Sequence, residues 1–172
     1  MRELRFSPFS RLVWRYTPVE QTALDTQPSF LYGGRFNPRA EFGMLYTSTS
    51  LQGAKAEFMK AAKLAAQDPD FLLPQMLHQI EVNFEKVVDL TDQKNLSFFG
   101  YSFEELIGDD WTPTQKIGTQ LRNFCDAILS YSAADPKHKN FNLYIINPGS
   151  VAVVGSTKIQ AMVDWNQIKP VR

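Results

Sequence analysis

The chain has 172 residues, of which 44% are apolar, and this is enough for one domain with a core. Its 18 basic and 18 acidic residues give a formal net charge of zero, which argues against sequence-independent nucleic-acid binding because such binding needs a strongly positive surface. The sequence has no apolar run of membrane-spanning length and no signal-peptide pattern. We therefore expect a cytoplasmic protein with one domain over residues 1–172 that neither enters a membrane nor binds nucleic acid directly.

The predicted elements of the first half are a strand, a long connection, a second strand and a helix. They cover residues 11–16, 17–37, 44–49 and 51–67, respectively, and the connection is polar and punctuated by proline and glycine. Ser50 precedes the helix and is a suitable N-cap, because its hydroxyl can accept a hydrogen bond from a free amide of the first turn.

The second half is dominated by short strands. The predicted strands cover residues 77–90, 127–131, 142–146 and 158–165, and the predicted helices cover residues 103–107 and 113–125. Ile80, Val82 and Phe84 alternate along the first of these strands and are expected on one buried side. Many short strands with only two clear helices indicate an α+β domain. We expect mixed, mostly antiparallel β-sheets with flanking helices.

Three residues suggest a binding site. Arg35 lies in a turn rich in glycine and proline, Tyr46 lies in the following strand, and Glu57 lies within the apolar stripe of the next helix. Lys60 and Lys63 are predicted on the opposite side of that helix. A carboxylate that faces a core is costly unless it is paired, so Glu57 forms either a structural ion pair or the charged floor of a cleft. The nearby arginine favours the cleft, and the three residue types suit a phosphorylated, aromatic ligand.

Several other kinds of site are not supported by the sequence. His78 and His138 have no histidine or cysteine partners at metal-binding spacing and are expected at the surface, so we predict no metal. The chain has no Gly-x-Ser-x-Gly motif, and Gly33–Gly34 matches neither a Walker A motif nor a dinucleotide-binding fingerprint. Cys125, the single cysteine, is expected to be a buried, inert thiol.

These residues resemble the RES domain family, which is named for an arginine, a glutamate and a serine. The resemblance is carried by GGRFNP at 33–38, LYTSTS at 45–50, Ala56-Glu57, Trp14-Arg15, TQKIG at 114–118 and AILSYSA at 127–133. It covers about residues 12–165. Ser132 takes the place of the family's serine, and Ser130 is the competing choice. Phe36 stands where the family usually has tryptophan, and Tyr131 where it often has proline.

The resemblance implies a fold similar to that of ADP-ribosyltransferases and an enzyme that acts on NAD+. We expect an NAD+-degrading enzyme, a glycohydrolase or a phosphorylase, that uses NAD+ as substrate and no further cofactor. The family also implies the toxin of a toxin–antitoxin pair, held inactive by a protein antitoxin or immunity inhibitor. A mono-ADP-ribosyltransferase and a catalytically inactive binding domain are the alternatives. The acceptor, the oligomeric state and the choice between an endogenous toxin and an injected effector stay open.

Each candidate residue then receives a role. Arg15 and Arg35 would bind the pyrophosphate, Tyr46 would stack on nicotinamide or close the pocket, and Glu57 would stabilise the cationic ribose. Ser132 would hydrogen-bond a ribose or a phosphate, whereas Asn37 is expected to cap the loop. The structural alternatives are a strand-end salt bridge for Arg15, a half-buried strand tyrosine for Tyr46 and a turn serine for Ser132.

Overall fold

The chain is organised around one curved, mixed β-sheet. The structure is a computed structural model and describes residues 3–144 and 149–171. The strands are β1 (Ser7–Pro18), β2 (Leu45–Ser48), β3 (Gln75–Asp89), β4 (Ala127–Tyr131), β5 (Lys139–Leu143) and β6 (Val151–Ile159). Their order is β1-β2-β5-β4-β3-β6, and β1 also pairs with β3. This extra pairing closes five strands into a barrel, to which β6 adds along β3.

The sheet confirms the expected α+β, mostly antiparallel character, but not the separate sheets that we expected. Among the described strands, β3 and β4 form the one parallel pair. The long β3 explains the single sheet, because one edge pairs with β1 while the other pairs first with β6 and then, at its end, with β4. One strand therefore links all parts of the sheet.

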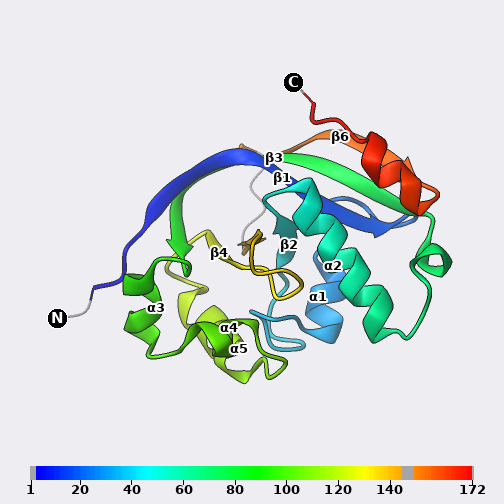
Figure 1. Ribbon diagram of the computed structural model, residues 1–172. Coiled ribbons are helices and arrows are strands. Elements are labelled where there is room, and N and C mark those ends of the chain that lie inside the picture. The colour runs from blue at the N-terminus through cyan, green and yellow to red at the C-terminus, as the bar shows by residue number, and fades with distance from the viewer. Residues whose placement is uncertain (1–2, 145–148, 172) are drawn as a thin grey trace.

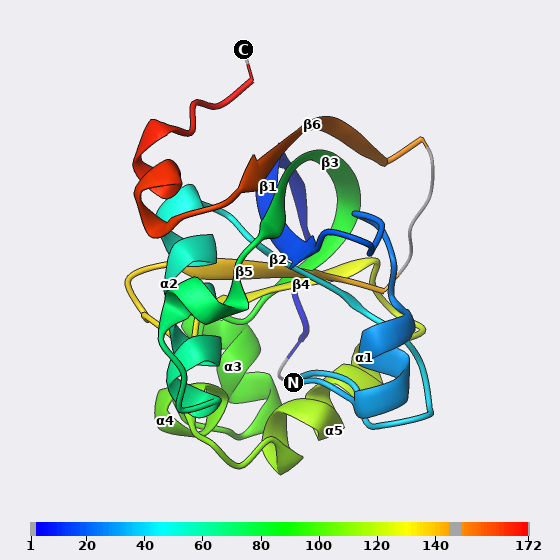
Figure 2. The same ribbon diagram turned by 90° about the vertical axis from the view of Figure 1, so that its right-hand side faces the viewer.

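The helices lie mainly on one side of the barrel. They are α1 (Gln27–Tyr32), α2 (Leu51–Leu64), α3 (Gln93–Phe99), α4 (Phe103–Ile107) and α5 (Thr112–Leu121), with 3-10 turns at Pro69–Leu72 and Met162–Gln167. In Figure 1 the β1–β3 ribbon arches over the short strands, and α3, α4 and α5 gather beneath them. Figure 2 shows α1 and α2 on opposite sides of the molecule. No described helix has the length and apolarity needed to cross a bilayer.

The core follows from the alternation of apolar residues in the strands. Ile80, Val82 and Phe84 are all buried inside the barrel, as predicted. A second cluster packs α3, α4 and α5 against the sheet, and a third packs Phe58 of α2 against Trp165. Burial of each such side chain stabilises the fold by roughly 1.5–3 kcal/mol. Apolar contacts thus fix α2, α3, α4 and α5 to the barrel.

Several element boundaries differ from those predicted. Ser50 caps α2 as expected and accepts a hydrogen bond from the Gly53 amide at 3.0 Å, but the helix ends at Leu64 rather than at residue 67. The chain leaves the helix at Ala66, which has a positive φ of 51°. Helices α1 and α3 were not predicted at all. Strand β5 lies at 139–143 rather than at 142–146, and residues 145 and 146 lie outside the described residues.

The predicted final strand at 158–165 is wrong. Strand β6 begins earlier, at Val151, and ends at Ile159. The Asp164 carboxylate accepts hydrogen bonds from the amides of Gln160 and Ala161 at 2.7 and 2.9 Å. Such an acidic cap turns the chain into the 3-10 helix at Met162–Gln167 instead of allowing the strand to continue.

The prediction that both histidines lie at the surface is wrong for His78. Its side chain is buried and hydrogen-bonded to the hydroxyls of Thr17 at 3.0 Å and Ser156 at 2.8 Å. The reason is that β3 has a neighbouring strand on both edges at this position, with Ser156 directly opposite His78 on β6. Burial, helped by the positive charge of Arg15, lowers the pKa of His78.

We expect His78 to make the fold less stable in mild acid. Because its pKa is lowered in the folded state, the unfolded chain takes up the proton first as the pH falls through about 6.5. The free energy of unfolding should therefore fall between pH 7.5 and 5.5. Urea titration of the wild type and of His78→Gln at both pH values measures this. An equal loss in the variant would assign the effect to other groups.

Candidate functional site

A cavity of about 510 Å³ lies between α1, α2 and strands β1, β2, β4 and β5. This volume is within the range typical of small-molecule sites. The charged and polar residues that line it include Arg15, Arg35, Tyr46, Lys60, Glu57, Ser130, Asn140 and Asn142. Four of the five predicted site residues therefore face one space. The fifth, Ser132, does not line the cavity, but its hydroxyl is hydrogen-bonded to the Glu57 carboxylate.

The loop that carries Arg35 is held in shape by Asn37. Helix α1 ends at Gly33, whose φ of 76° is a conformation that glycine adopts readily. The buried Asn37 side chain donates hydrogen bonds to the carbonyls of Ser29 and Phe42, both at 2.8 Å. Its predicted role as a loop cap is thereby confirmed. A Cβ atom on Gly118 of α5 would overlap the Phe36 carbonyl, so the loop also rests directly on that helix.

Tyr46 anchors the same loop through its hydroxyl. The hydroxyl accepts a hydrogen bond from the Phe36 amide at 2.9 Å and donates one to Asn37 Oδ1 at 2.7 Å. Burial raises the pKa of Tyr46, so the phenol stays protonated and can donate. The side chain also lines the cavity. In the structure, Tyr46 holds the loop that carries Arg35 against β2. The sequence did not predict this role.

Arg35 is held by neutral groups. Its Nη1 atom donates to the carbonyls of Leu106 at 3.0 Å and Gly108 at 2.8 Å, at the end of α4. The guanidinium carbon lies 5.8 Å from the centroid of the Trp111 ring, a cation–π distance. Burial lowers the pKa of Arg35, and the negative charge of Glu57 opposes that shift. The negative charge of Glu57 therefore acts on the guanidinium, although the two described side chains form no ion pair.

Arg15 has a similar setting on β1. Its Nη1 and Nη2 atoms donate to the carbonyls of Tyr46 at 3.2 Å and Asp25 at 2.9 Å, and burial lowers its pKa to about 10. Within residues 3–144 and 149–171 it has no carboxylate at ion-pair distance, so the strand-end salt bridge considered above is not formed. Its charge is held at the cavity wall by carbonyl groups.

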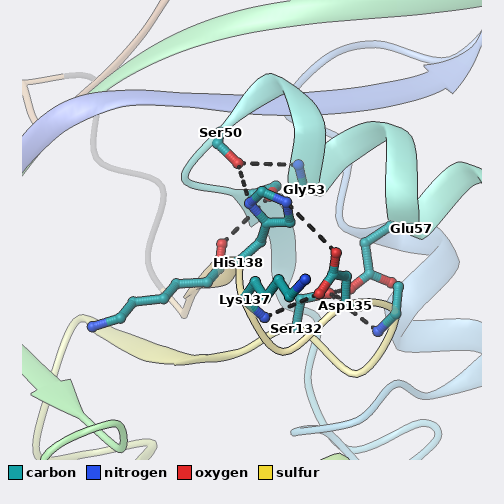
Figure 3. Close-up of polar contacts among 10 residues, drawn as sticks. Ser50, Gly53, Glu57, Ser132, Asp135, Lys137 and His138 are labelled. Atoms are coloured by element: carbon teal, nitrogen blue, oxygen red, sulfur yellow. Dashed lines mark hydrogen bonds and ion pairs between the residues drawn. The ribbon is translucent and has the colours of Figure 1, made fainter.

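Glu57 is fixed by two hydrogen bonds to one of its oxygen atoms. Ser132 Oγ donates to Glu57 Oε1 at 2.6 Å, and Asn140 Nδ2 donates to the same atom at 2.7 Å. Ser132 Oγ itself accepts from the amides of Ala134 and Asp135 at 3.1 and 3.3 Å, so its own hydrogen points to the carboxylate. Figure 3 shows Ser132 and the loop that follows it packed against the beginning of α2, beside Glu57.

The other carboxylate oxygen is available to a ligand. Within the described part of the chain, Glu57 Oε2 has no hydrogen-bond partner, and Glu57 forms no ion pair. The structural ion pair considered for Glu57 is therefore not formed with any described residue. The two serines considered for the family's serine have different positions. Ser132 positions the carboxylate, whereas Ser130 lines the cavity and accepts a hydrogen bond from Asn142.

The amides of Asn140 and Asn142 are among the cavity groups that the sequence did not predict. Asn140 and Asn142 alternate with buried Phe141 and Leu143 along β5, and this alternation places both amides on the cavity side. Lys60 was placed on the wrong side of α2. It follows Glu57 by three residues, a spacing that puts the two side chains on one helix face, and it lines the same cavity.

The sequence comparisons give one family. A family model described as the RES domain matches residues 12–165. An NAD(+) phosphorylase of Mycobacterium bovis, MbcT, is 31% identical over 112 residues, which cover 64% of this chain and 60% of that protein. A probable NAD(+) phosphorylase of Mycobacterium tuberculosis is 31% identical over 132 residues, which cover 77% of this chain and 63% of that protein. The matched segments thus span less than two thirds of these curated relatives.

A solved structure shares the fold. A chain from the crystal structure of the Mycobacterium tuberculosis MbcT–MbcA toxin–antitoxin complex superimposes with a TM-score of 0.85. The match has 24% sequence identity and covers 94% of this chain and 90% of the other. The barrel with its added strand and flanking helices is therefore an architecture already seen in that protein.

Removal of the Tyr46 hydroxyl should destabilise the fold. Tyr46→Phe leaves the Phe36 amide and Asn37 Oδ1 without their partner, and we expect a loss of about 1–3 kcal/mol in the free energy of unfolding. Urea denaturation measures this loss. Tyr131→Phe is the matched control, because its hydroxyl has no hydrogen-bond partner among the described residues while its ring packs on Phe103. Equal stability of the two variants would contradict the anchoring role.

Proposed function

The chain belongs to the RES domain family, and we propose that it is an NAD+ phosphorylase that cleaves the bond between nicotinamide and ribose. The observation that carries this proposal is the convergence of Arg35, Tyr46 and Glu57 on one cavity. Among the described residues, one carboxylate oxygen has no hydrogen-bond partner and the arginines have no ion-pair partner. The names of two relatives, which are an NAD(+) phosphorylase and a probable one, support the same reaction.

The dinucleotide is bound through its pyrophosphate. Arg35 and Arg15 hold positive charge at the cavity wall without carboxylate partners among the described residues. Arginine forms charge-assisted hydrogen bonds to phosphate oxygens, and the low dielectric of a half-enclosed site strengthens them. Tyr46, on β2 at the cavity, supplies an aromatic wall for nicotinamide. We propose that this mode of binding resembles that of ADP-ribosyltransferases.

Glu57 acts on the reacting carbon. When the bond between the nicotinamide nitrogen and ribose C1 breaks, its electron pair neutralises the pyridinium and leaves positive charge on the ribose. A fixed carboxylate beside C1 stabilises this charge as it develops. Ser132 and Asn140 hold Oε1, so Oε2 is the atom that faces the ribose. Because both hydrogen bonds exist before the substrate binds, little reorganisation is needed during the reaction.

Phosphate is the acceptor that we propose. An oxygen of the hydrogen phosphate dianion forms the new bond to C1, and the products are nicotinamide and the 1-phosphate of ADP-ribose. The phosphate keeps its proton throughout, so no general base is required. Water would have to lose a proton, and a protein acceptor would have to enter the cavity. The relatives named phosphorylases support phosphate over both.

We also propose that the protein is the cytoplasmic toxin of a toxin–antitoxin pair. Uncontrolled consumption of NAD+ would harm the cell that makes the enzyme, so a protein inhibitor that covers the cavity is required. The support comes from the structure with the same fold, which is that of a toxin–antitoxin complex. NAD+ itself is the substrate, and no additional cofactor enters the proposed reaction.

Glu57→Gln should lower the rate of nicotinamide release by about 10²- to 10³-fold, because an amide carries no charge to stabilise the ribose cation. The variant can still accept a hydrogen bond from Ser132 and should fold normally. Purified protein, freed of any partner, is incubated with NAD+ and phosphate, and nicotinamide is quantified by chromatography.

The control is Glu81→Gln, which changes an exposed glutamate of β3 and should leave the rate unchanged. An inactive wild type would overturn the proposed function. Full activity of Glu57→Gln would remove Glu57 from the mechanism. Labelled ADP-ribose found attached to a protein instead of to phosphate would replace phosphorolysis with ADP-ribosylation.

A further inference from the structure

Lys60 is a cavity cation that the proposed dinucleotide site does not use. It lies on α2 one turn beyond Glu57 and lines the same cavity. Its Nζ atom donates to the carbonyl of Ala133 at 3.1 Å. A lysine ammonium has three donors, so two of them are left for a ligand.

Lys60 does not form an ion pair with Glu57, its neighbour on the same helix face, among the described residues. A glutamate and a lysine three residues apart on a helix often form an ion pair. Among the described residues, however, the one pair within 4.0 Å is His138–Asp135, so Lys60 and Glu57 do not pair. The reason lies in the loop after β4, where Ser132 binds Glu57 and the next residue, Ala133, binds Lys60. Two adjacent residues thus hold the carboxylate and the ammonium separately.

The charges of the proposed reaction require a third cation. The pyrophosphate of NAD+ carries two negative charges, which Arg15 and Arg35 can balance one each. A phosphate dianion that approaches the ribose carbon beside Glu57 would meet a carboxylate of the same sign. Like charges repel strongly at such short range in a partly buried site. The approach therefore needs a positive group that lies close to the carboxylate and is not neutralised by it.

We propose that Lys60 binds the acceptor phosphate and directs it to the ribose carbon. This inference rests on the proposed phosphorylase function and identifies the group that selects phosphate over water. Two ammonium hydrogens bind phosphate oxygens, and a further oxygen of the same phosphate forms the bond to C1 as the bond to nicotinamide breaks. The electron pair leaves with nicotinamide, and the phosphate keeps its proton.

Steady-state kinetics at varied phosphate and fixed NAD+, with products resolved by ³¹P NMR, tests the assignment. Loss of two charge-assisted hydrogen bonds in Lys60→Gln should raise the KM for phosphate by about 10- to 100-fold. The KM for NAD+ should change by less than about twofold. At limiting phosphate the product should shift from the 1-phosphate of ADP-ribose to free ADP-ribose. Lys60→Arg should recover part of the phosphate affinity, because it keeps the charge.

Lys63→Gln is the matched control, since Lys63 is an exposed residue of the same helix and does not line the cavity. Its KM for phosphate should equal that of the wild type. An unchanged KM for phosphate in Lys60→Gln would overturn this inference and leave the proposed function standing. A raised KM for NAD+ alone would also overturn it, because Lys60 would then belong to the dinucleotide site. A wild type that does not consume NAD+ would overturn both.

Discussion

The site depends on how one carboxylate is held inside the protein. Glu57 faces the cavity from α2, and a charged group there needs compensation to be stable. That compensation comes from neutral donors, Ser132 at the end of β4 and Asn140 on β5. Ser132 Oγ accepts hydrogen bonds from two backbone amides, so its own hydrogen is donated to Glu57. Strand β5 and the turn after β4 therefore orient the carboxylate through Oε1 and leave its other oxygen toward the cavity.

The cations around Glu57 follow the same rule. Each is held by backbone carbonyls, which are the Tyr46 and Asp25 carbonyls for Arg15, the Leu106 and Gly108 carbonyls for Arg35 and the Ala133 carbonyl for Lys60. Within the described residues none of them has a carboxylate at ion-pair distance. A carbonyl orients a cation without cancelling its charge, whereas a carboxylate would cancel most of it. The arrangement keeps three positive charges available to an anionic ligand.

The parts of the site that the sequence predicts are those set by local spacing. Helical periodicity places Glu57 away from solvent, and the glycines place Arg35 on a loop. Lys60 was also predictable, since a separation of three residues keeps it on the face of Glu57. It was misplaced because Lys60 and Lys63 were assigned together to the solvent side, whereas only Lys63 of the two is exposed and Lys60 lines the cavity. The hydrogen bond between Ser132 and Glu57 joins residues that lie 75 positions apart in the sequence. Likewise, His78 is buried because β6 pairs with β3 at this position. Local spacing contains neither contact, so only the tertiary structure reveals them.

Uncompensated cations are costly in the empty protein, and this cost is visible in the arginines. Burial lowers the pKa of Arg15 to about 10 and lowers that of Arg35 as well, which means that the surroundings disfavour their charged forms. An anion in the cavity would oppose this effect, because it would supply the negative charge that the carbonyl groups do not. The proposed phosphate-bearing ligand would thus recover the free energy lost in desolvating the arginines. The turn after β4 keeps Lys60 from pairing with Glu57, because Ser132 holds the carboxylate and the Ala133 carbonyl holds the ammonium.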